Sequence, residues 1–89
     1  MSKWTIEFSD NAFKEFGKLD RNTQIMINAW IQKHLENVDS PRVFGKALSG
    51  DKAGQWRYRI GDYRMLCLIK DNELIILVIK LGHRRDVYL

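Results

Sequence analysis

The segment at positions 56–64, WRYRIGDYR, concentrates the side chains best suited to bind an anion. It carries Arg57, Arg59 and Arg64, three arginines in nine positions. A guanidinium is planar, stays charged and can donate to two phosphate oxygens at once. It therefore suits the binding of an anion, but it cannot act as a base near neutral pH. These three residues, the arginine cluster, therefore predict an anionic partner, and any proton transfer beside them would need other side chains.

The last nine residues, LGHRRDVYL, supply candidates for that proton transfer. His83 has an unperturbed pKa of about 6.5. Tyr88, at about 10, could act as a phenolate if guanidiniums stabilise it. Arg84 and Arg85 add further donors. The structural alternatives are a histidine with a packing role, a solvated Arg85 and a tyrosine that packs at an edge.

The arginines are positioned by a predicted hairpin. Residues 54–60 and 63–69 are predicted as strands joined by Gly61-Asp62, two residues that tolerate positive φ. In this register Arg59 faces Arg64, and Arg57 lies diagonally beside them on the same face. Opposed like charges destabilise a sheet by up to about 1 kcal/mol. A bound anion would relieve this repulsion, whereas the structural alternative is an open face of solvated arginines.

A third strand is predicted at about 73–80, after a tight turn at Asp71-Asn72. This register pairs Lys70 with Glu73, a favourable cross-strand ion pair. In an antiparallel meander the end of this strand lies beside the start of its neighbour. The tail beyond residue 80 is therefore expected to reach the arginine cluster.

The elements before the hairpin are a strand at residues 3–8 and two helices. Ser9 and Asp10 offer caps for a helix that ends near Gly17, and Asp20 caps a second helix that runs from Arg21 to about Asn37. Residues 38–53 are predicted as loop. The apolar stripes are interpreted as Ala12, Phe13 and Phe16 in the first helix, and Ile25, Ala29 and Leu35, flanked by Met26, Ile27, Trp30 and Ile31, in the second.

These elements predict one α+β domain over residues 1–89: an N-terminal strand, two helices and a three-strand antiparallel meander, with the helices packed on one face of a four-stranded sheet. The opposite face is basic at one end and apolar at the other. The apolar end consists of Leu66, Leu68, Ile75, Leu77 and Ile79. Such a face needs a cover. The structural alternatives are that these residues belong to a partially buried central strand or that a second copy of the chain covers them in a homodimer. The more specific hypothesis is that a segment of a partner protein lies across this face.

Composition excludes several classes of protein. The net charge is +4, which suggests an anionic partner, and a single cysteine, Cys67, cannot form an internal disulfide. The chain has no metal-ligand spacing, no phosphate-cradling glycine run and no Ser-His-Asp order. We therefore expect a soluble, intracellular protein without a metal, a cofactor or a membrane span, in which Cys67 is an inert core residue.

Three segments, WRYRIGDYRMLC, ELIILVIKLGHR and DVY, follow a strand and two helices. In this order they resemble the RelE toxins of bacterial toxin–antitoxin pairs, within the RelE/ParE superfamily, over nearly the whole chain. The resemblance implies a cytoplasmic, metal-independent endoribonuclease that enters the ribosomal A site and cuts mRNA by attack of a 2′-hydroxyl. It also implies a RelB-like antitoxin that covers the apolar face, with operator DNA bound only indirectly, through the antitoxin complex.

The family's motif places its site on Arg57, Arg59, Arg64, Arg84 and Tyr88. The resemblance implies that Tyr88 is the base, with His83 as the other candidate, and that Arg84 steadies the leaving oxygen. Lys46, Lys52 and Arg85 would hold ribosomal or messenger phosphate. The best-studied members carry lysines at the positions of Arg57 and Arg59, and some relatives use a glutamate base, for which Asp51 is the only nearby acid.

Two other functions fit the same fold. A ParE-like toxin inhibits DNA gyrase, although such a protein does not need an assembled phosphate site. A non-catalytic RNA- or protein-binding module could use the same basic face.

Overall fold

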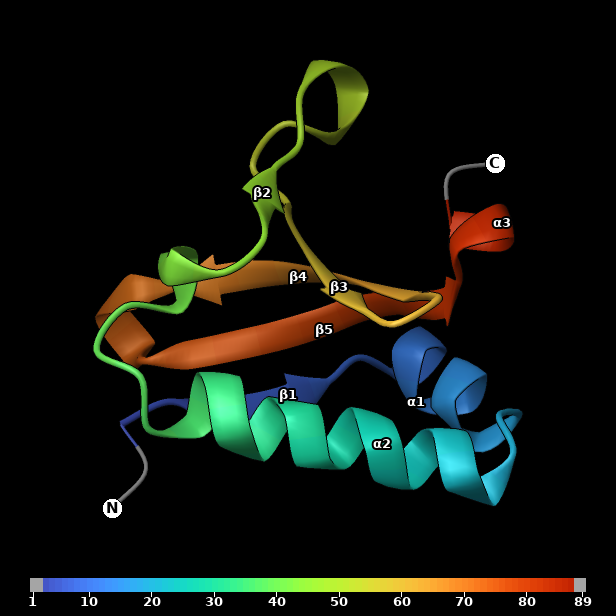
Figure 1. Cartoon of the computed structure of the whole chain (residues 1–89). Helices are drawn as coiled ribbons and strands as arrows, with labels where there is room; N and C mark the ends of the chain where they lie inside the picture. The colour runs from blue at the N-terminus through green and yellow to red at the C-terminus, as the bar shows by residue number, and fades with distance from the viewer. Residues whose placement is uncertain (1–2, 88–89) are drawn as a thin grey trace.

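The computed structural model describes residues 3–87 as a mixed α+β structure (Figure 1). Its strands and helices, in chain order, are β1 (Thr5–Phe8), α1 (Asp10–Gly17), α2 (Arg21–Ile31), β2 (Lys46–Ala47), β3 (Trp56–Ile60), β4 (Tyr63–Lys70), β5 (Ile75–His83) and α3 (Arg84–Val87). A π-helical turn, Gln32–Glu36, continues α2, and short 3-10 turns lie at Pro41–Val43, Gly50–Lys52 and Asp71–Glu73.

The strands form one five-stranded sheet in the order β1-β5-β4-β3-β2. β1 runs parallel to β5, and the other neighbouring pairs are antiparallel. Helices α1 and α2 lie on one side of the sheet, and α3 lies on the other (Figure 1). The predicted α+β arrangement is confirmed, with one addition. The two-residue strand β2 pairs with β3 as a fifth strand, and it is too short to produce a periodic signal in the sequence.

The first hairpin has the predicted register. Ile60 pairs with Tyr63, Arg59 with Arg64 and Tyr58 with Met65. Gly61 adopts a φ of 59° in the turn, a conformation in which glycine has no side chain to strain. The alternation that this register imposes places the arginine cluster on one face and the apolar residues on the other.

The second hairpin differs from the prediction. Lys70 pairs with Ile75 and not with Glu73, because the connection is a 3-10 turn closed by Leu74 in the left-handed conformation, at a φ of 55°. The shift is two residues, so the alternation is kept and Ile76 still faces the core. In the predicted strand at 73–80, alternation would place Leu74 on the core face together with Ile76 and Val78, but Leu74 is 49% exposed.

A bulge interrupts the pairing of β4 with β5. Leu66 pairs with Lys80 and Cys67 with Val78, so Ile79 is an additional residue in β5. Beyond the bulge the inward positions of β5 move by one residue. Leu81, which is 1% exposed, therefore belongs to the core.

Both predicted helix caps are present. Ser9 Oγ accepts a hydrogen bond from Ala12 N at 3.1 Å, and Asp20 Oδ2 accepts one from Thr23 N at 3.3 Å. The cap at Ser9 ties the start of α1 to the end of β1. α2 and the π-helical turn together reach Glu36, close to the predicted end.

The apolar stripe of α2 is rotated from the predicted one. Ile27, Ile31 and Leu35 are at most 4% exposed, whereas Ile25 is 56% exposed. This helix has apolar residues on most of its sides, so periodicity alone admits more than one stripe. In α1, Phe13 is likewise outside the core, at 68% exposure.

The core lies between the sheet and the two long helices. Tyr58 is fully buried there, and its hydroxyl donates a 2.6 Å hydrogen bond to the carbonyl of Pro41, which holds the following loop against the end of the sheet. The other buried apolar members are Trp4, Ala12, Ile27, Ile31, Leu35, Ile60, Met65, Cys67, Ile76, Val78 and Leu81. Within residues 3–87, no helix combines the length and apolarity needed to cross a bilayer.

Candidate functional site

The arginine cluster lies on the sheet face opposite α1 and α2, with Arg59 directly across from Arg64. The three side chains are not equivalent. Arg64 is only 7% exposed, and its Nη1 donates to the carbonyls of Gly61 at 3.0 Å and Tyr63 at 2.9 Å. These carbonyl dipoles offset part of its charge and fix it at the hairpin turn. Arg59 is exposed and Arg57 half-buried, so both present charge at the surface.

The end of the chain is attached to the same hairpin turn. Arg84 N donates a 2.8 Å hydrogen bond to the carbonyl of Asp62, and Arg84 Nη1 lies 4.0 Å from Asp62 Oδ1. Gly82 pairs with Arg64 across the two strands. The prediction that the tail reaches the arginine cluster is therefore confirmed, and Arg84 carries a fourth guanidinium to this end of the sheet.

Helix α3 folds back against the sheet at Gly82. A β-carbon on this glycine would lie 3.4 Å from Val87 Cγ2, so the helix packs closely against the strand. Val87 is 1% exposed. The packing of α3 thus covers part of the face that also carries Arg64.

His83 belongs to a different environment from the arginines. It pairs with Tyr63, whose ring packs against the core, and the two rings meet edge to face at 5.6 Å. Its Nδ1 accepts a 3.2 Å hydrogen bond from Arg85 N, which makes it a cap for α3. An accepting Nδ1 places the ring proton of a neutral imidazole on Nε2. In this geometry His83 offers a donor at Nε2, and it must release the cap to act as a base through Nδ1.

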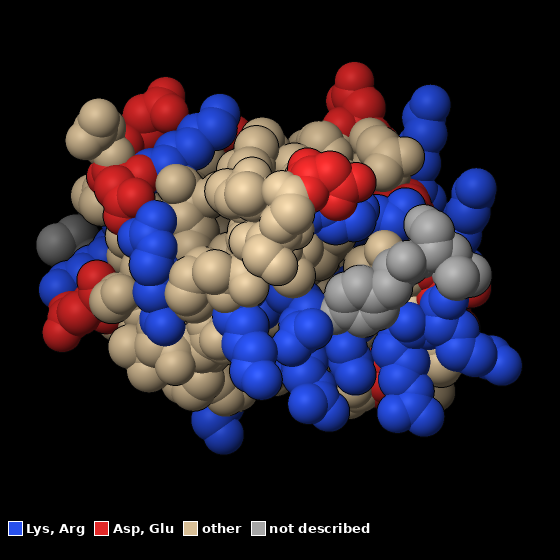
Figure 2. Space-filling model, turned by 90° about the horizontal axis from the view of Figure 1, so that it is seen from above, with Lys and Arg blue, Asp and Glu red and all other residues tan. Residues whose placement is uncertain are grey.

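The remaining candidate residues are spread around the cluster. Lys46 in β2 pairs with Arg57 across the two strands, so it lies next to the arginine cluster. Lys52 lies on the segment that projects from the sheet between β2 and β3 (Figure 1), and Arg85 is exposed on α3. Tyr88 lies outside the described residues. Seen from above, the molecule has Lys and Arg side chains gathered in a band along one side (Figure 2).

The apolar part of this face is less open than predicted. Leu66 is 1% exposed, so in the free chain it belongs to the interior. The other four predicted contact residues, Leu68, Ile75, Leu77 and Ile79, are half-buried. The accessible apolar surface therefore lies toward the end of the sheet distant from α3.

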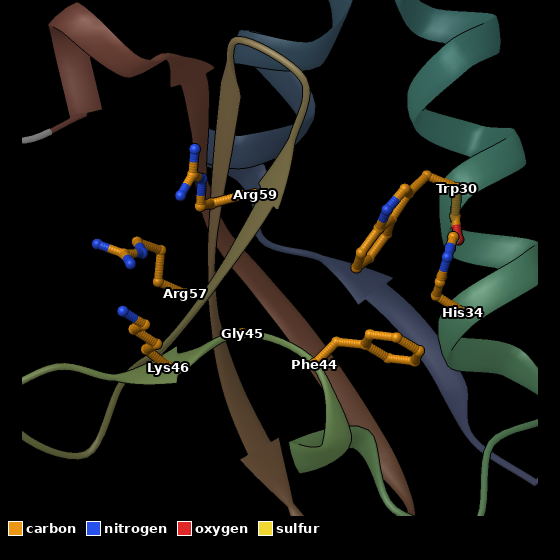
Figure 3. Close-up of a pocket in the computed structure, with 7 residues that line it drawn as sticks. All are labelled: Trp30, His34, Phe44, Gly45, Lys46, Arg57 and Arg59. Atoms are coloured by element: carbon orange, nitrogen blue, oxygen red, sulfur yellow. The ribbon is translucent and has the colours of Figure 1, made fainter.

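A pocket of about 270 Å³ opens beside β3, and some of the residues that line it were not predicted as site residues from the sequence. Its lining residues are Trp30, His34, Phe44, Gly45, Lys46, Arg57 and Arg59. Figure 3 shows the three rings on the α2 side of β3 and the three cationic side chains directed to the other side. Trp30 and His34 are four residues apart on a helix, a spacing that could have signalled a shared face. Phe44 lies in a loop, where no periodicity marks it.

The rings of the pocket are fixed by their own contacts. His34 stacks on Trp30 at 4.5 Å and meets Phe44 edge-on at 4.9 Å. His34 Nδ1 lies 3.0 Å from the carbonyl of Trp30. Because a carbonyl only accepts, this contact places a proton on Nδ1, so in the neutral tautomer the lone pair is on Nε2.

Burial determines the two large pKa shifts among the described groups. It raises the pKa of the Tyr58 hydroxyl well above its usual value, and it does the same for the Cys67 thiol. Both groups therefore stay protonated at neutral pH and have no role as a base or nucleophile. Among residues 3–87, no group of three or more His, Cys, Asp or Glu side chains is arranged to hold a metal ion.

Residues 6–88 match the family described as the ParE toxin of the type II toxin-antitoxin system, parDE. The chain belongs to the RelE/ParE superfamily of toxins. This toxin is 27% identical over 85 residues to Toxin RelG of Mycobacterium tuberculosis, an alignment that covers 96% of this chain and 95% of the relative.

Solved structures agree with this family. The toxin superposes on a chain of the toxin–antitoxin complex RelBE2 from Mycobacterium tuberculosis with a TM-score of 0.84 and 27% identity, covering 97% of each chain. It superposes on the isolated Escherichia coli RelE toxin with a TM-score of 0.71 and 20% identity, covering 96% of this chain and 90% of that one. The second likeness, at this identity, is evidence of a shared fold alone.

Proposed function

We propose that this toxin is a metal-independent endoribonuclease that cuts mRNA in the ribosomal A site and so stops translation in the cytoplasm. The observation that carries the proposal is the convergence of cationic side chains at one end of the sheet. Arg59 faces Arg64, Lys46 faces Arg57, and Arg84 is tied to the turn of the same hairpin. Opposed cations of this kind are compensated when a phosphate binds between them.

The cleavage chemistry needs three roles. A base removes the proton of the 2′-hydroxyl, whose oxygen attacks the adjacent phosphorus; cations stabilise the charge on the phosphate oxygens; an acid protonates the departing 5′-oxygen. The products are a 2′,3′-cyclic phosphate and a free 5′-hydroxyl. Arg57, Arg59 and Lys46 suit the second role because they present charge at the surface.

The other roles follow from position. Arg64, anchored by two carbonyls, holds the hairpin turn and adds a fixed positive charge beneath the phosphate. Arg84 is 59% exposed next to this turn, a suitable place to steady the leaving oxygen. Tyr88 follows α3 directly in sequence and is the proposed base. His83, the other candidate base, must release the Arg85 N–H before Nδ1 can accept a proton, and its neutral Nε2–H can only hydrogen-bond the leaving oxygen, which takes its proton from water.

The proposed partners include a RelB-like antitoxin. Two structural relatives are toxin–antitoxin complexes, RelBE2 of Mycobacterium tuberculosis and RelBE of Escherichia coli. The half-buried residues Leu68, Ile75, Leu77 and Ile79 form an apolar contact surface for such a chain. Operator DNA would be bound only through that complex.

The test is a translating extract in which mRNA 5′ ends are mapped after the toxin is added. Arg59→Ala and Arg84→Ala remove exposed donors, so we expect the protein to stay folded and cleavage to fall by about 100- to 1,000-fold, the usual effect of losing one transition-state donor. Lys14→Ala, an exposed lysine on α1 at the other side of the sheet, is the matched control.

Two results would contradict the proposal. Cleavage that persists when a deoxyribonucleotide replaces the ribonucleotide at the cut site would exclude attack by the 2′-hydroxyl. Intact message together with blocked DNA supercoiling in a parallel gyrase assay would indicate the other activity of the superfamily.

A further inference from the structure

The pocket beside β3 lies where the sheet loses its outer strand. β2 pairs only with Trp56 and Arg57, so within the described chain the rest of β3 has no strand on its outer side. The chain enters β2 through Gly45, which approaches β3 so closely that a β-carbon would lie 2.3 Å from Arg57 O. Position 45 therefore has no room for a side chain, and this corner is bounded by the backbone of Arg57 and the rings of Trp56 and Tyr58.

The aromatic side of the pocket, formed by Trp30, His34 and Phe44, is preorganised by contacts within the protein. Trp30 contacts His34 on one side and Tyr58 on another, at ring separations of 4.5 and 5.6 Å. The backbone of Phe44 is held by Trp56, whose Nε1 donates a 2.7 Å hydrogen bond to the Phe44 carbonyl. Rings fixed in this way lose little conformational freedom when a flat ligand binds.

The other side of the pocket is cationic, and it is continuous with the proposed phosphate site. Lys46, Arg57 and Arg59 line the pocket (Figure 3), Arg57 and Arg59 belong to the arginine cluster, and Lys46 pairs with Arg57. The volume of about 270 Å³ is below the range of roughly 300–1,000 Å³ typical for drug-sized ligands. The pocket therefore suits one flat ring system attached to an anionic group.

We infer that this pocket binds a single nucleobase of the RNA, next to the phosphate held by Arg57 and Arg59. Proteins commonly bind single-stranded RNA by combining aromatic contacts to the base with cationic contacts to the backbone. The inference rests on the proposed function for the identity of the ligand as RNA. It adds Trp30, His34 and Phe44 as the residues that hold the base.

An aromatic, acidic peptide is the competing occupant, since it would offer rings and negative charge as well. RNA is favoured because the same two arginines line the pocket and face the proposed cleavage site. One nucleotide spans both regions with its base and its phosphate, whereas a peptide would need two separate side chains.

The experiment measures binding without cleavage. The probe is a trideoxynucleotide, which has no 2′-hydroxyl, and the reference probe is the same molecule with an abasic middle position. Binding is followed by NMR through the indole N–H of Trp30 and the backbone amides of residues 44–46. Phe44 is replaced by Ala and, to restore a ring, by Tyr; Val43→Ala is the control, because Val43 is the adjacent apolar residue, is 68% exposed and does not line the pocket.

We expect Phe44→Ala to weaken binding of the full probe by about 5- to 140-fold, the range found when a stacked aromatic is removed. Phe44→Tyr should restore binding, and Val43→Ala should leave it unchanged. The ratio of the affinities for the full and the abasic probe should be smaller in Phe44→Ala than in the wild type, since Trp30 and His34 still contact the base. Equal binding of the two probes to the wild type would overturn the inference, as would an acidic aromatic peptide that shifts these signals while the trinucleotide does not.

This outcome is separable from that of the cleavage assay. If base-dependent binding is found but mRNA stays intact in the translating extract, the nucleobase pocket stands and the proposed enzyme activity fails. If mRNA is cut but the full and the abasic probe bind equally well, only the inference about the pocket is wrong.

Discussion

Gly45 is the residue at which a single methyl group should disturb the candidate site most selectively. It has a φ of 82°, a conformation that costs alanine about 1–2 kcal/mol. A β-carbon there would also lie 2.3 Å from Arg57 O and 2.7 Å from Trp56 Nε1. The first of these atoms is backbone, so no side-chain rotation can relieve the contact. In Gly45→Ala the chain entering β2 must therefore move away from β3.

The magnitude follows from the bonds that this movement breaks. Besides the pairing of β2 with β3, the segment is held by the hydrogen bond from Trp56 Nε1 to Phe44 O and, farther along, by one from Leu48 N to the carbonyl of Gln55, just before β3. Each is worth about 0.5–1.5 kcal/mol net. Together with the backbone conformation, Gly45→Ala should lower the free energy of unfolding by about 2–5 kcal/mol.

Gly50 provides the matched control. It has a positive φ of 67°, but no atom lies within 4 Å of its would-be β-carbon. Gly50→Ala should therefore lose only about 1–2 kcal/mol. Urea unfolding and thermal melts compare the two variants, and the melting temperature of Gly45→Ala should be lower by at least about 4 °C. Equal stability would refute the argument that the close approach at Gly45 matters.

Other parts of the fold give three further expectations. Tyr58→Phe leaves the Pro41 carbonyl without its donor and should lower stability by about 1–3 kcal/mol in urea unfolding; an unchanged midpoint would contradict this. The Arg42 guanidinium lowers the pKa of the Asp71 carboxyl, so this pair should stabilise the fold above about pH 3.9 and lose its effect as the pH falls through the lowered native pKa. Urea midpoints of wild type and Asp71→Asn should therefore differ more at pH 7 than at pH 2. Cys67 is fully buried with a raised pKa, so iodoacetamide should modify it only in denaturant; rapid labelling of the folded protein would refute its burial.

The first hairpin could be predicted because two independent signals agree. Gly61 favours a tight turn, and the alternation on either side fixes which residues share a face. The second hairpin could not, because the favourable pairing of Lys70 with Glu73 suggested a turn two residues too short. A cross-strand ion pair is worth only a few tenths of a kcal/mol to about 1 kcal/mol, which is too little to determine the register; the chain instead forms the 3-10 connection that ends at Leu74.

The part of the candidate site that could be predicted from the sequence is the part that follows from the alternation of side chains along the strands. That rule brought Arg59 opposite Arg64, but it did not reveal that Arg64 is anchored by carbonyls or that His83 caps α3. These contacts depend on how the turn and the tail fold back, which no local pattern encodes. The ring of Phe44 was missed for the same reason, since a loop residue has no period.

The parallel pairing of β1 with β5 affects when the toxin can complete its fold during synthesis. Thr5 pairs with Ile75, 70 positions later in the chain, so β1 cannot enter the sheet until β5 has been synthesised. Until then the sheet lacks its outer strand next to β5, and pairings between residues so far apart in sequence form slowly. The strands that carry the arginines and the segment that brings in Arg84 are also translated late. A nascent chain therefore cannot assemble its cationic site until β5 and the residues that follow it, Arg84 included, have left the ribosome.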